Sequence, residues 1–119
     1  MFELFIQDSV YKFNFGFGFL KEIQKLQVQE FNGAKMEVGL RFAILGLVSG
    51  DPIQLWNVLS IASKYAPEGS LRLTPAVFEA YLNDAQTDPF EVVLDFLSNQ
   101  GCTRKLTQKV LEDLAKEQK

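Results

Sequence analysis

The segment YKFNFGFGFLKEI, residues 11–23, constrains the fold of this chain more than any other feature, because its apolar period changes within it. Aromatic residues occupy every second position from Tyr11 to Phe19, the period of a β-strand, so all five could face one way. After Phe19 the apolar residues follow helical spacing. Gly16 and Gly18 lie where the period changes, and we expect them to serve the backbone and not a ligand.

The residues before this change of period predict an N-terminal β-hairpin over about residues 1–16. The runs FELFI and VYKFNF have strand composition, and the polar residues QDS separate them. A two-stranded ribbon is barely stable alone, so we expect it to pack on helices or on another subunit.

The remainder, about residues 17–119, is predicted to be helical. A first helix over about 18–28 ends before EFNGAK, where Asn-Gly indicates a turn. A second helix over about 36–49 is apolar on almost every side and should be the most buried. Its Gly39 and Gly46 would let neighbouring elements approach closely.

Three later helices are predicted to start at a proline. In DPIQ, LTPA and DPFE, the residues Asp51, Thr74 and Asp88 are N-caps and the following proline takes the first helical position. Gly50 ends the second helix, and Thr103 caps a final one. The sequence therefore predicts a single domain, residues 1–119, of α+β class but mostly α, with an N-terminal β-hairpin followed by five to six short helices.

Composition excludes several classes of function. The net charge of −3 and pI near 4.9 argue against nucleic acid as the main partner. The longest apolar run, residues 38–48, is too short for a membrane span, and no secretory signal is expected. The single Cys102 fits a reducing cytosol.

The sequence also argues against an enzyme. It contains no histidine, which removes the common catalytic triads and zinc ligand sets. Asp84, Asp88 and Glu91 are better explained as helix-cap chemistry than as a carboxylate cluster. We therefore expect no catalytic, cofactor-binding or metal-binding residues.

Charge is distributed unevenly along the chain. Residues 51–102 hold seven acidic and two basic residues, net −5, whereas residues 103–119 hold five basic and three acidic residues, net +2. Solvated faces would explain this, and so would a basic terminal helix that docks on an acidic surface of its own chain or a neighbour. The candidate residues for contact with a partner or a second copy are Phe13, Phe15, Phe17, Phe19, Trp56, Leu106 and Val110.

The segments YKFNFGFGFLKEI, GLRFAILGLVSGDPIQLWNVLSIA and DPFEVVLDFL, with a lysine-bearing helix behind them, carry a resemblance to a known family. In this order and at this length, the chain resembles the tail assembly chaperones of long-tailed (siphovirus-type) phages and prophages of Gram-positive bacteria. The resemblance covers nearly the whole chain.

The resemblance implies a non-catalytic protein of the host bacterial cytoplasm that binds the long, helical tape measure protein and keeps it soluble during tail morphogenesis. It implies absence from the mature virion. Its implied partners are the tape measure protein and a longer frameshifted form. The surplus of aromatic residues, the unpaired hairpin edge and the opposite charges of residues 51–102 and 103–119 separately predict a homo-oligomer in a head-to-tail arrangement. From composition we expect neither nucleic acid nor a membrane as a partner. The alternative is a small cytosolic regulatory adaptor that sequesters a single protein partner.

Overall fold

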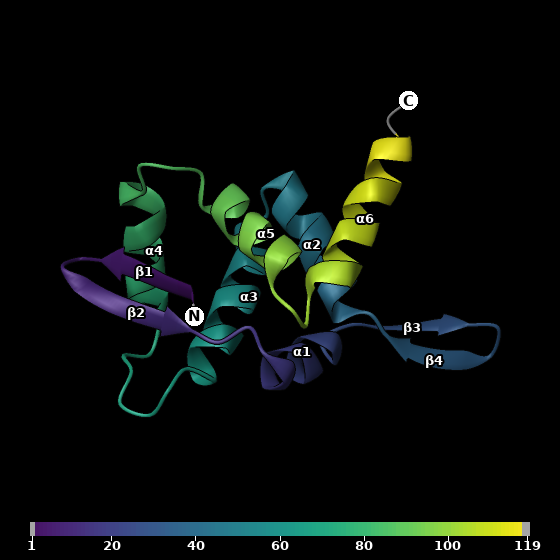
Figure 1. Cartoon of the computed structure of the whole chain (residues 1–119), viewed down its shortest axis with the longest axis horizontal. Coiled ribbons are helices and arrows are strands. Elements are labelled where there is room, and N and C mark those ends of the chain that lie inside the picture. Colours follow the sequence, from purple (N-terminus) through teal and green to yellow (C-terminus); the bar gives the residue numbers. More distant parts are fainter. Residues whose placement is uncertain (1, 118–119) are drawn as a thin grey trace.

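The computed structural model describes residues 2–117, which form two β-hairpins and six helices (Figure 1). In chain order the elements are β1 (Phe2–Ile6), β2 (Ser9–Phe13), α1 (Phe17–Gln24), β3 (Val28–Phe31), β4 (Ala34–Glu37), α2 (Gly39–Ser49), α3 (Pro52–Lys64), α4 (Pro75–Asp84), α5 (Pro89–Asn99) and α6 (Arg104–Glu117). The predicted class, mostly helical with an N-terminal β-hairpin, is confirmed. No helix in these residues is long and apolar enough to cross a membrane.

The N-terminal hairpin packs on helices of its own chain. β1 and β2 pair antiparallel, with Phe2 opposite Phe13, and both rings are buried. The two residues between the strands have φ angles of 49° and 66°, which suit the tight turn that matches strand twist. Beyond β2, the backbone N–H of Asn14 donates to the carbonyl of Ala62 in α3 at 3.0 Å. These contacts supply the support that an isolated ribbon lacks.

The three predicted Pro-initiated helix starts are confirmed, whereas the hydroxyl of Thr103, predicted to cap the last helix, donates to the carbonyl of Leu97 at 2.7 Å. Asp51, Thr74 and Asp88 each accept a hydrogen bond from a backbone N–H two or three residues later, at 2.9, 3.3 and 2.9 Å. Each bond satisfies one of the donors that a helix N-terminus leaves unpaired. Gly50 ends α2 with a φ of 80°, in the left-handed region that glycine adopts without strain.

Two predicted helix boundaries are wrong, because a second hairpin lies between α1 and α2. The helix predicted over 18–28 ends at Gln24, and the helix predicted over 36–49 begins at Gly39. β3 and β4 pair antiparallel between them, and their turn residues 32–33 have φ angles of 52° and 83°. The Asn-Gly pair is therefore the two-residue turn of a hairpin and not part of a loop.

The predicted close approach at the α2 glycines is confirmed. A Cβ atom on Gly39 would overlap the carbonyl oxygen of Ile23 and lie 2.7 Å from its carbonyl carbon. A Cβ on Gly46 would overlap the side chain of Gln54 in α3. α2 is also the most buried helix in its share of residues, six of 11 against six of 13 in α3.

Gly16 and Gly18 are needed for close packing and not for a left-handed backbone conformation. Neither has a positive φ angle. A Cβ on Gly18 would lie 2.7 Å from the ring of Tyr65, and one on Gly16 would lie 2.9 Å from the side-chain oxygen of Asn14. The prediction that these glycines serve the backbone holds in the form of close approach.

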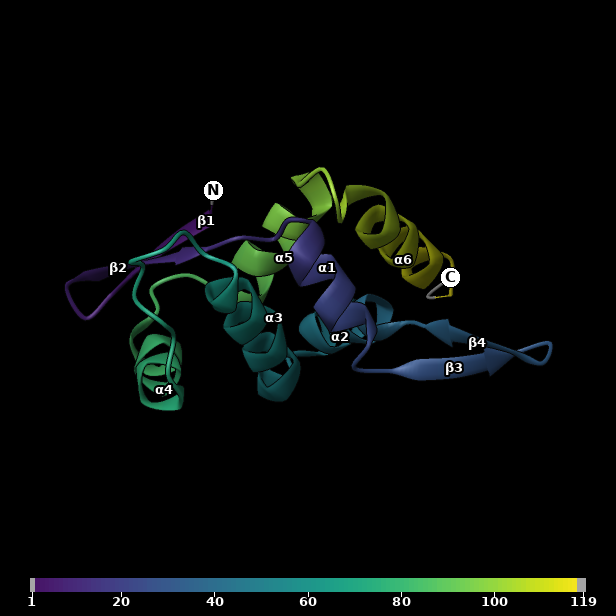
Figure 2. The same cartoon turned by 90° about the horizontal axis from the view of Figure 1, so that it is seen from below.

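The molecule is elongated, with a hairpin at each end of its long axis. Its extents are 48 × 33 × 24 Å. β1, β2 and α4 lie at one end, and β3 and β4 project from the other, clear of the helices in both views (Figures 1 and 2).

Candidate interaction surfaces

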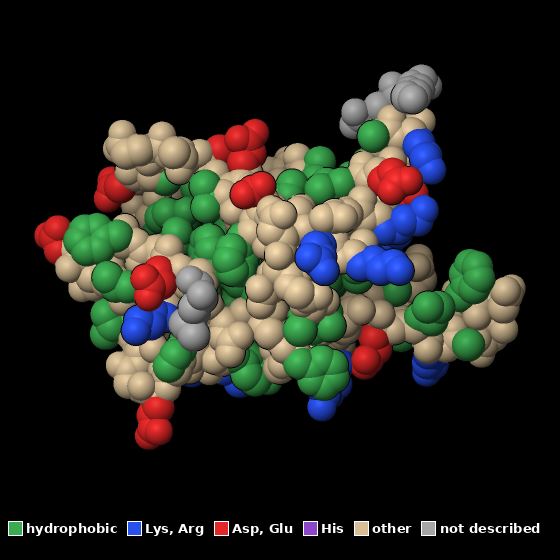
Figure 3. All heavy atoms as spheres, viewed as in Figure 1, with side chains coloured by type: hydrophobic (Ala, Val, Ile, Leu, Met, Phe, Trp, Pro, Cys, Tyr) green, Lys and Arg blue, Asp and Glu red, His purple; other side chains and the backbone are tan. Residues whose placement is uncertain are grey.

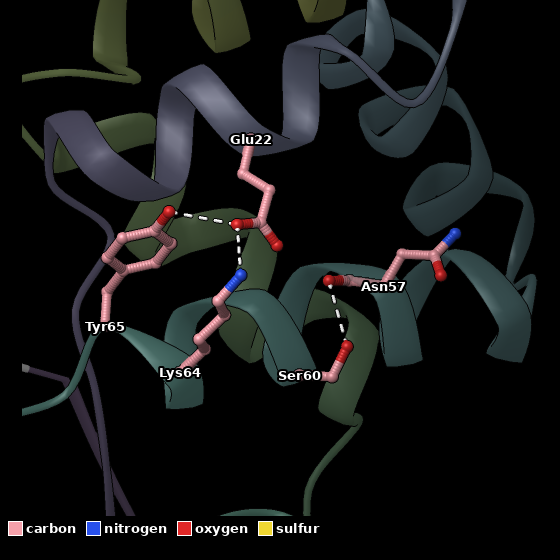
Figure 4. Close-up of polar contacts among 5 residues, drawn as sticks. All are labelled: Glu22, Asn57, Ser60, Lys64 and Tyr65. Atoms are coloured by element: carbon pink, nitrogen blue, oxygen red, sulfur yellow. Dashed lines mark hydrogen bonds and ion pairs between the residues drawn. The ribbon is translucent and has the colours of Figure 1, made fainter.

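The most connected polar cluster joins α1 to the end of α3 (Figure 4). The carboxylate oxygen of Glu22 lies 2.7 Å from Nζ of Lys64 and accepts a hydrogen bond from the hydroxyl of Tyr65 at 2.9 Å. The hydrogen bond from Lys64 lowers the pKa of Glu22 below its ordinary value of 4.5, partly opposed by burial, and the same carboxylate raises the pKa of Tyr65. Each group is paired, so the cluster is a tether between helices.

The predicted row of phenylalanines does not face one way. Phe13, Phe15 and Phe19 are at most 1% exposed and belong to the core, whereas Phe17 is 67% exposed. The reason is that β2 ends at Phe13 and α1 begins at Phe17, so strand alternation does not reach Phe17, and helical geometry turns its side chain away from that of Phe19. As a surface for partners, only Phe17 of this row is available in the folded chain.

The other candidate contact residues divide in the same way. Val110 is 1% exposed and lies in the core, whereas Trp56 and Leu106 are half-buried and reach the surface. α6, which carries Leu106, also bears Arg104 and Lys105 at its start, and both are exposed.

An apolar surface patch forms where the N-termini of α3 and α4 meet. We call it the α3–α4 patch, and it consists of Pro52, Ile53, Trp56, Pro75 and Phe78, around a shallow hollow of about 260 Å³. The rings of Trp56 and Phe78 meet edge to face, with centroids 5.4 Å apart, and Ile53 is 70% exposed beside them. The two Pro-initiated helix starts thus place five apolar side chains together with no charged residue among them.

The second hairpin forms a projecting arm, residues 28–37, in which every residue is exposed. Strand register places Phe31 opposite Ala34 and Gln29 opposite Met36. Because side chains alternate between faces, Phe31, Ala34 and Met36 share one face of the arm, and Phe31 and Met36 are 65% and 52% exposed. An apolar strand face that nothing covers is typical of an interaction site.

The root of the arm is fixed to α1. The backbone N–H of Val38 donates to the carbonyl of Gln27 at 2.8 Å, and that of Leu40 donates to the side-chain oxygen of Gln24 at 2.9 Å. Gly39 lies between these bonds, against the end of α1. The arm therefore leaves the body in a defined direction.

A groove lies at the opposite end of the molecule, between β1 and the end of α4. We call it the β1–α4 groove; its volume is about 230 Å³, and it is lined by Leu4, Phe5, Ile6, Gln7, Tyr81, Asp84, Ala85, Gln86, Thr87 and Val92. Phe5 at its rim is 69% exposed. The residues that line the groove include one acidic residue, Asp84, which is exposed.

Sequence reasoning missed the arm, the groove and most of the α3–α4 patch. Of these residues it had proposed only Trp56 as a contact. Within residues 2–117 no group of three or more His, Cys, Asp or Glu side chains is placed to hold a metal ion. Asp88, once considered part of a carboxylate cluster, caps α5.

Comparison with known proteins identifies the family of this chain. The model of a family described as "Phage tail assembly chaperone protein, TAC" matches residues 3–112, nearly the whole chain. Neither the curated proteins nor the solved structures gave a match. The match spans both hairpins, all of α1 to α5 and most of α6. The chain belongs to the phage tail assembly chaperone family.

Proposed function

We propose that this protein is a non-catalytic tail assembly chaperone that binds the tape measure protein of its phage and keeps it soluble while the tail is built. The observation that carries the proposal is the α3–α4 patch, together with membership of the family. Its place of action is the host bacterial cytoplasm, and it leaves before the virion is complete.

The α3–α4 patch suits an apolar stripe on a helical client. It is a shallow hollow with a rigid aromatic floor, formed by Trp56 and Phe78, and a projecting side chain, Ile53. Apolar helices commonly bind by laying one face into such a hollow. Complete burial of an Ile or Leu side chain contributes about 1.5–3 kcal/mol, so a few contacts of this kind give useful but reversible binding.

A chaperone that is later displaced needs modest affinity per copy and many copies. One small patch provides modest affinity, and a row of copies along a long client adds their contributions without tight binding at any single site. We therefore propose a homo-oligomer on the client, in a head-to-tail arrangement, with a longer frameshifted form as a further partner.

The proposal is tested by co-expression with the tape measure protein of the same phage. Ile53→Asp places a charge in the α3–α4 patch but leaves the fold intact, because Ile53 is exposed and an acidic residue is favourable in the first turn of a helix. We expect it to move most of the tape measure protein into the insoluble fraction.

The matched control is Leu71→Asp, which changes an equally apolar side chain, 49% exposed, outside the patch. It should keep the tape measure protein soluble, as the wild type does. If wild type and Ile53→Asp keep the client equally soluble, the patch is not the binding site. A one-to-one complex with some other protein, and none with the tape measure protein, would favour a regulatory adaptor instead.

A further inference from the structure

The outer edge of β1 is unoccupied within residues 2–117. β1 pairs with β2 along one edge only, so alternate residues of β1 direct their backbone N–H and C=O groups away from β2. In the described chain no backbone hydrogen bond joins residues 2–7 to any element other than β2. The outer edge of β1 therefore has backbone donors and acceptors that are free to pair with an added strand.

The β1–α4 groove lies beside this free edge. Its lining combines Leu4 and Ile6 of β1 with Tyr81 and Asp84 at the C-terminal end of α4. In Figure 1 the C-terminal half of α4 extends past β1 on the side away from β2, and Figure 3 shows apolar side chains open to solvent there. A strand added to β1 would lie over the end of α4 and cover these side chains.

The groove carries negative charge that no ion pair of the described residues neutralises. Asp84 is the last residue of α4, whose last turn holds no basic residue, and a negative side chain at this end opposes the helix dipole. The ion pairs within residues 2–117 lie elsewhere. Burial, and next the charge of nearby Asp88, raise the pKa of Tyr81. Two carboxylates and a helix C-terminus thus favour a cationic group in the groove.

The surroundings of the groove are acidic as well. Residues 2–13 and 66–88, which contain β1, β2 and α4, hold six acidic and two basic residues, net −4. The two basic residues are Lys12, which lies opposite Glu3 in the hairpin, and Arg72, in the loop before α4. Neither of them lines the groove. A basic partner is therefore attracted to this end of the molecule and an acidic one is repelled.

We propose that the β1–α4 groove binds an extended, basic segment of a partner protein, which adds a strand to the outer edge of β1. Main-chain hydrogen bonds to β1 supply affinity, and an arginine or lysine next to Asp84 supplies specificity. The rings of Phe5 and Tyr81 also line the groove, and aromatic rings attract cationic side chains. The groove is separate from the α3–α4 patch, so the inference does not depend on the proposed function.

The size of the site predicts weak binding. β1 has five residues, so an added strand of the same length spans about 17 Å at about 3.4 Å per residue. The hollow of about 230 Å³ holds one large side chain, since about 150 Å³ is enough for a benzene ring. Such a contact is much smaller than the about 800 Å² per partner of a standard interface, so we expect a dissociation constant of about 0.1–1 mM.

The test is an NMR titration of the purified, isotope-labelled chain with short capped peptides. The probe peptide has about seven residues, with one arginine flanked by valine and threonine, which favour the extended conformation. We expect it to shift the backbone amide signals of residues 4–7 and 81–87 until they saturate. The side-chain N–H of Trp56, the only tryptophan of the chain, reports on the α3–α4 patch and should not shift.

Two altered peptides separate the effect of charge from that of strand addition. Glutamate in place of the arginine should weaken binding about tenfold or more, because it meets the acidic groove. Methylation of alternate backbone nitrogens of the arginine peptide should weaken binding to a similar extent, because it removes the donors that pair with β1.

Charge reversal in the chain tests the role of Asp84. Asp84→Lys should exchange the preference, so that the glutamate peptide binds more tightly than the arginine peptide. Lysine is favourable at a helix C-terminus, so this variant should keep the fold. The matched control is Asp95→Lys, which makes the same change of charge at an exposed residue of α5 and should keep the preference for arginine.

Four results would overturn the inference. The arginine peptide could fail to bind at about 5 mM, could bind no better than the glutamate peptide, or could bind equally well when its backbone is methylated. The fourth is a shift of the β1 amide signals with the concentration of the chain alone, which would show that a second copy occupies the edge. Peptide-induced shifts confined to Trp56 would place the peptide in the α3–α4 patch, which also contradicts the inference but leaves the proposed function intact.

Discussion

Replacement of Gly39 by alanine should destabilise the fold strongly, because there is no room for a methyl group there. The added Cβ would overlap the carbonyl oxygen of Ile23 and lie 2.7 Å from its carbon, where real Cβ contacts stay beyond 3.0 Å. Because Ile23 belongs to the backbone of α1 and Gly39 to that of α2, relief of this overlap requires the two helices to move apart. Overpacking of this kind costs about 1–3 kcal/mol, and the rigid contact places Gly39→Ala near the upper end.

For a chain of 119 residues, 1 kcal/mol corresponds to a change of about 4 °C in Tm, so we expect a loss of about 8–12 °C. Urea unfolding followed by circular dichroism gives the free energy directly. Gly101→Ala is the matched control, since nothing lies within 4 Å of its Cβ position and its φ is not positive, so it should be neutral or slightly stabilising. A Gly39→Ala variant within about 0.5 kcal/mol of wild type would refute the reasoning.

Three further predictions concern the core and the α1–α3 tether. Phe15→Ala should lower the free energy of unfolding by about 3–5 kcal/mol because the ring is buried. Phe17→Ala should leave Tm nearly unchanged because that ring is exposed. Equal losses of Tm in the two variants would contradict the placement of Phe15 in the core and Phe17 on the surface. Because Lys64 lowers the pKa of Glu22 below 4.5, the pair stabilises the fold above that pH and the contribution is lost as pH falls through the lowered value. In urea titrations Glu22→Gln should thus be less stable than wild type at pH 7, by under about 1 kcal/mol, with the difference shrinking as the pH falls below 4.5, and a constant difference would argue against the pair. Thr107→Val should raise the free energy of unfolding by up to about 1 kcal/mol, because the Thr107 hydroxyl is buried without a hydrogen-bond partner. A clear loss of stability would show that the hydroxyl does have a hydrogen-bond partner.

The parts of the fold that sequence could predict are those set by local chemistry. Asp51, Thr74 and Asp88 cap helices because a side-chain acceptor next to a proline acts within two or three residues. The change of period before Phe19 likewise places the first strand-to-helix junction, although the helix begins at Phe17.

The arm was missed although its signal was present. An Asn-Gly pair between two short runs with alternating side chains is a strong hairpin signal, but the flanking residues are exposed on both faces and lack the regular apolar alternation of a half-buried strand. Apolar residues such as Val28 were therefore assigned to the preceding helix, whose stripe they extend.

The α3–α4 patch and the β1–α4 groove could not be predicted from local patterns. Ile53 and Phe78 are 25 positions apart, and each lies on a helix whose apolar stripe looks like ordinary core. Whether such residues are buried or exposed depends on how the helices pack, which the spacing within one helix does not specify. Trp56 was proposed as a contact residue, whereas the other four residues of the patch were not.

The most direct test of the central claim is site-specific photo-cross-linking to the tape measure protein. A photoreactive phenylalanine analogue at position 53 projects from the α3–α4 patch, and the same analogue at position 71 projects from a surface outside it. Co-expressed with its tape measure protein and irradiated, the chain labelled at position 53 should form a covalent adduct with that protein, and the chain labelled at position 71 should form little or none. Equal adducts from both positions, or none from position 53 while the two proteins still co-purify, would contradict the account.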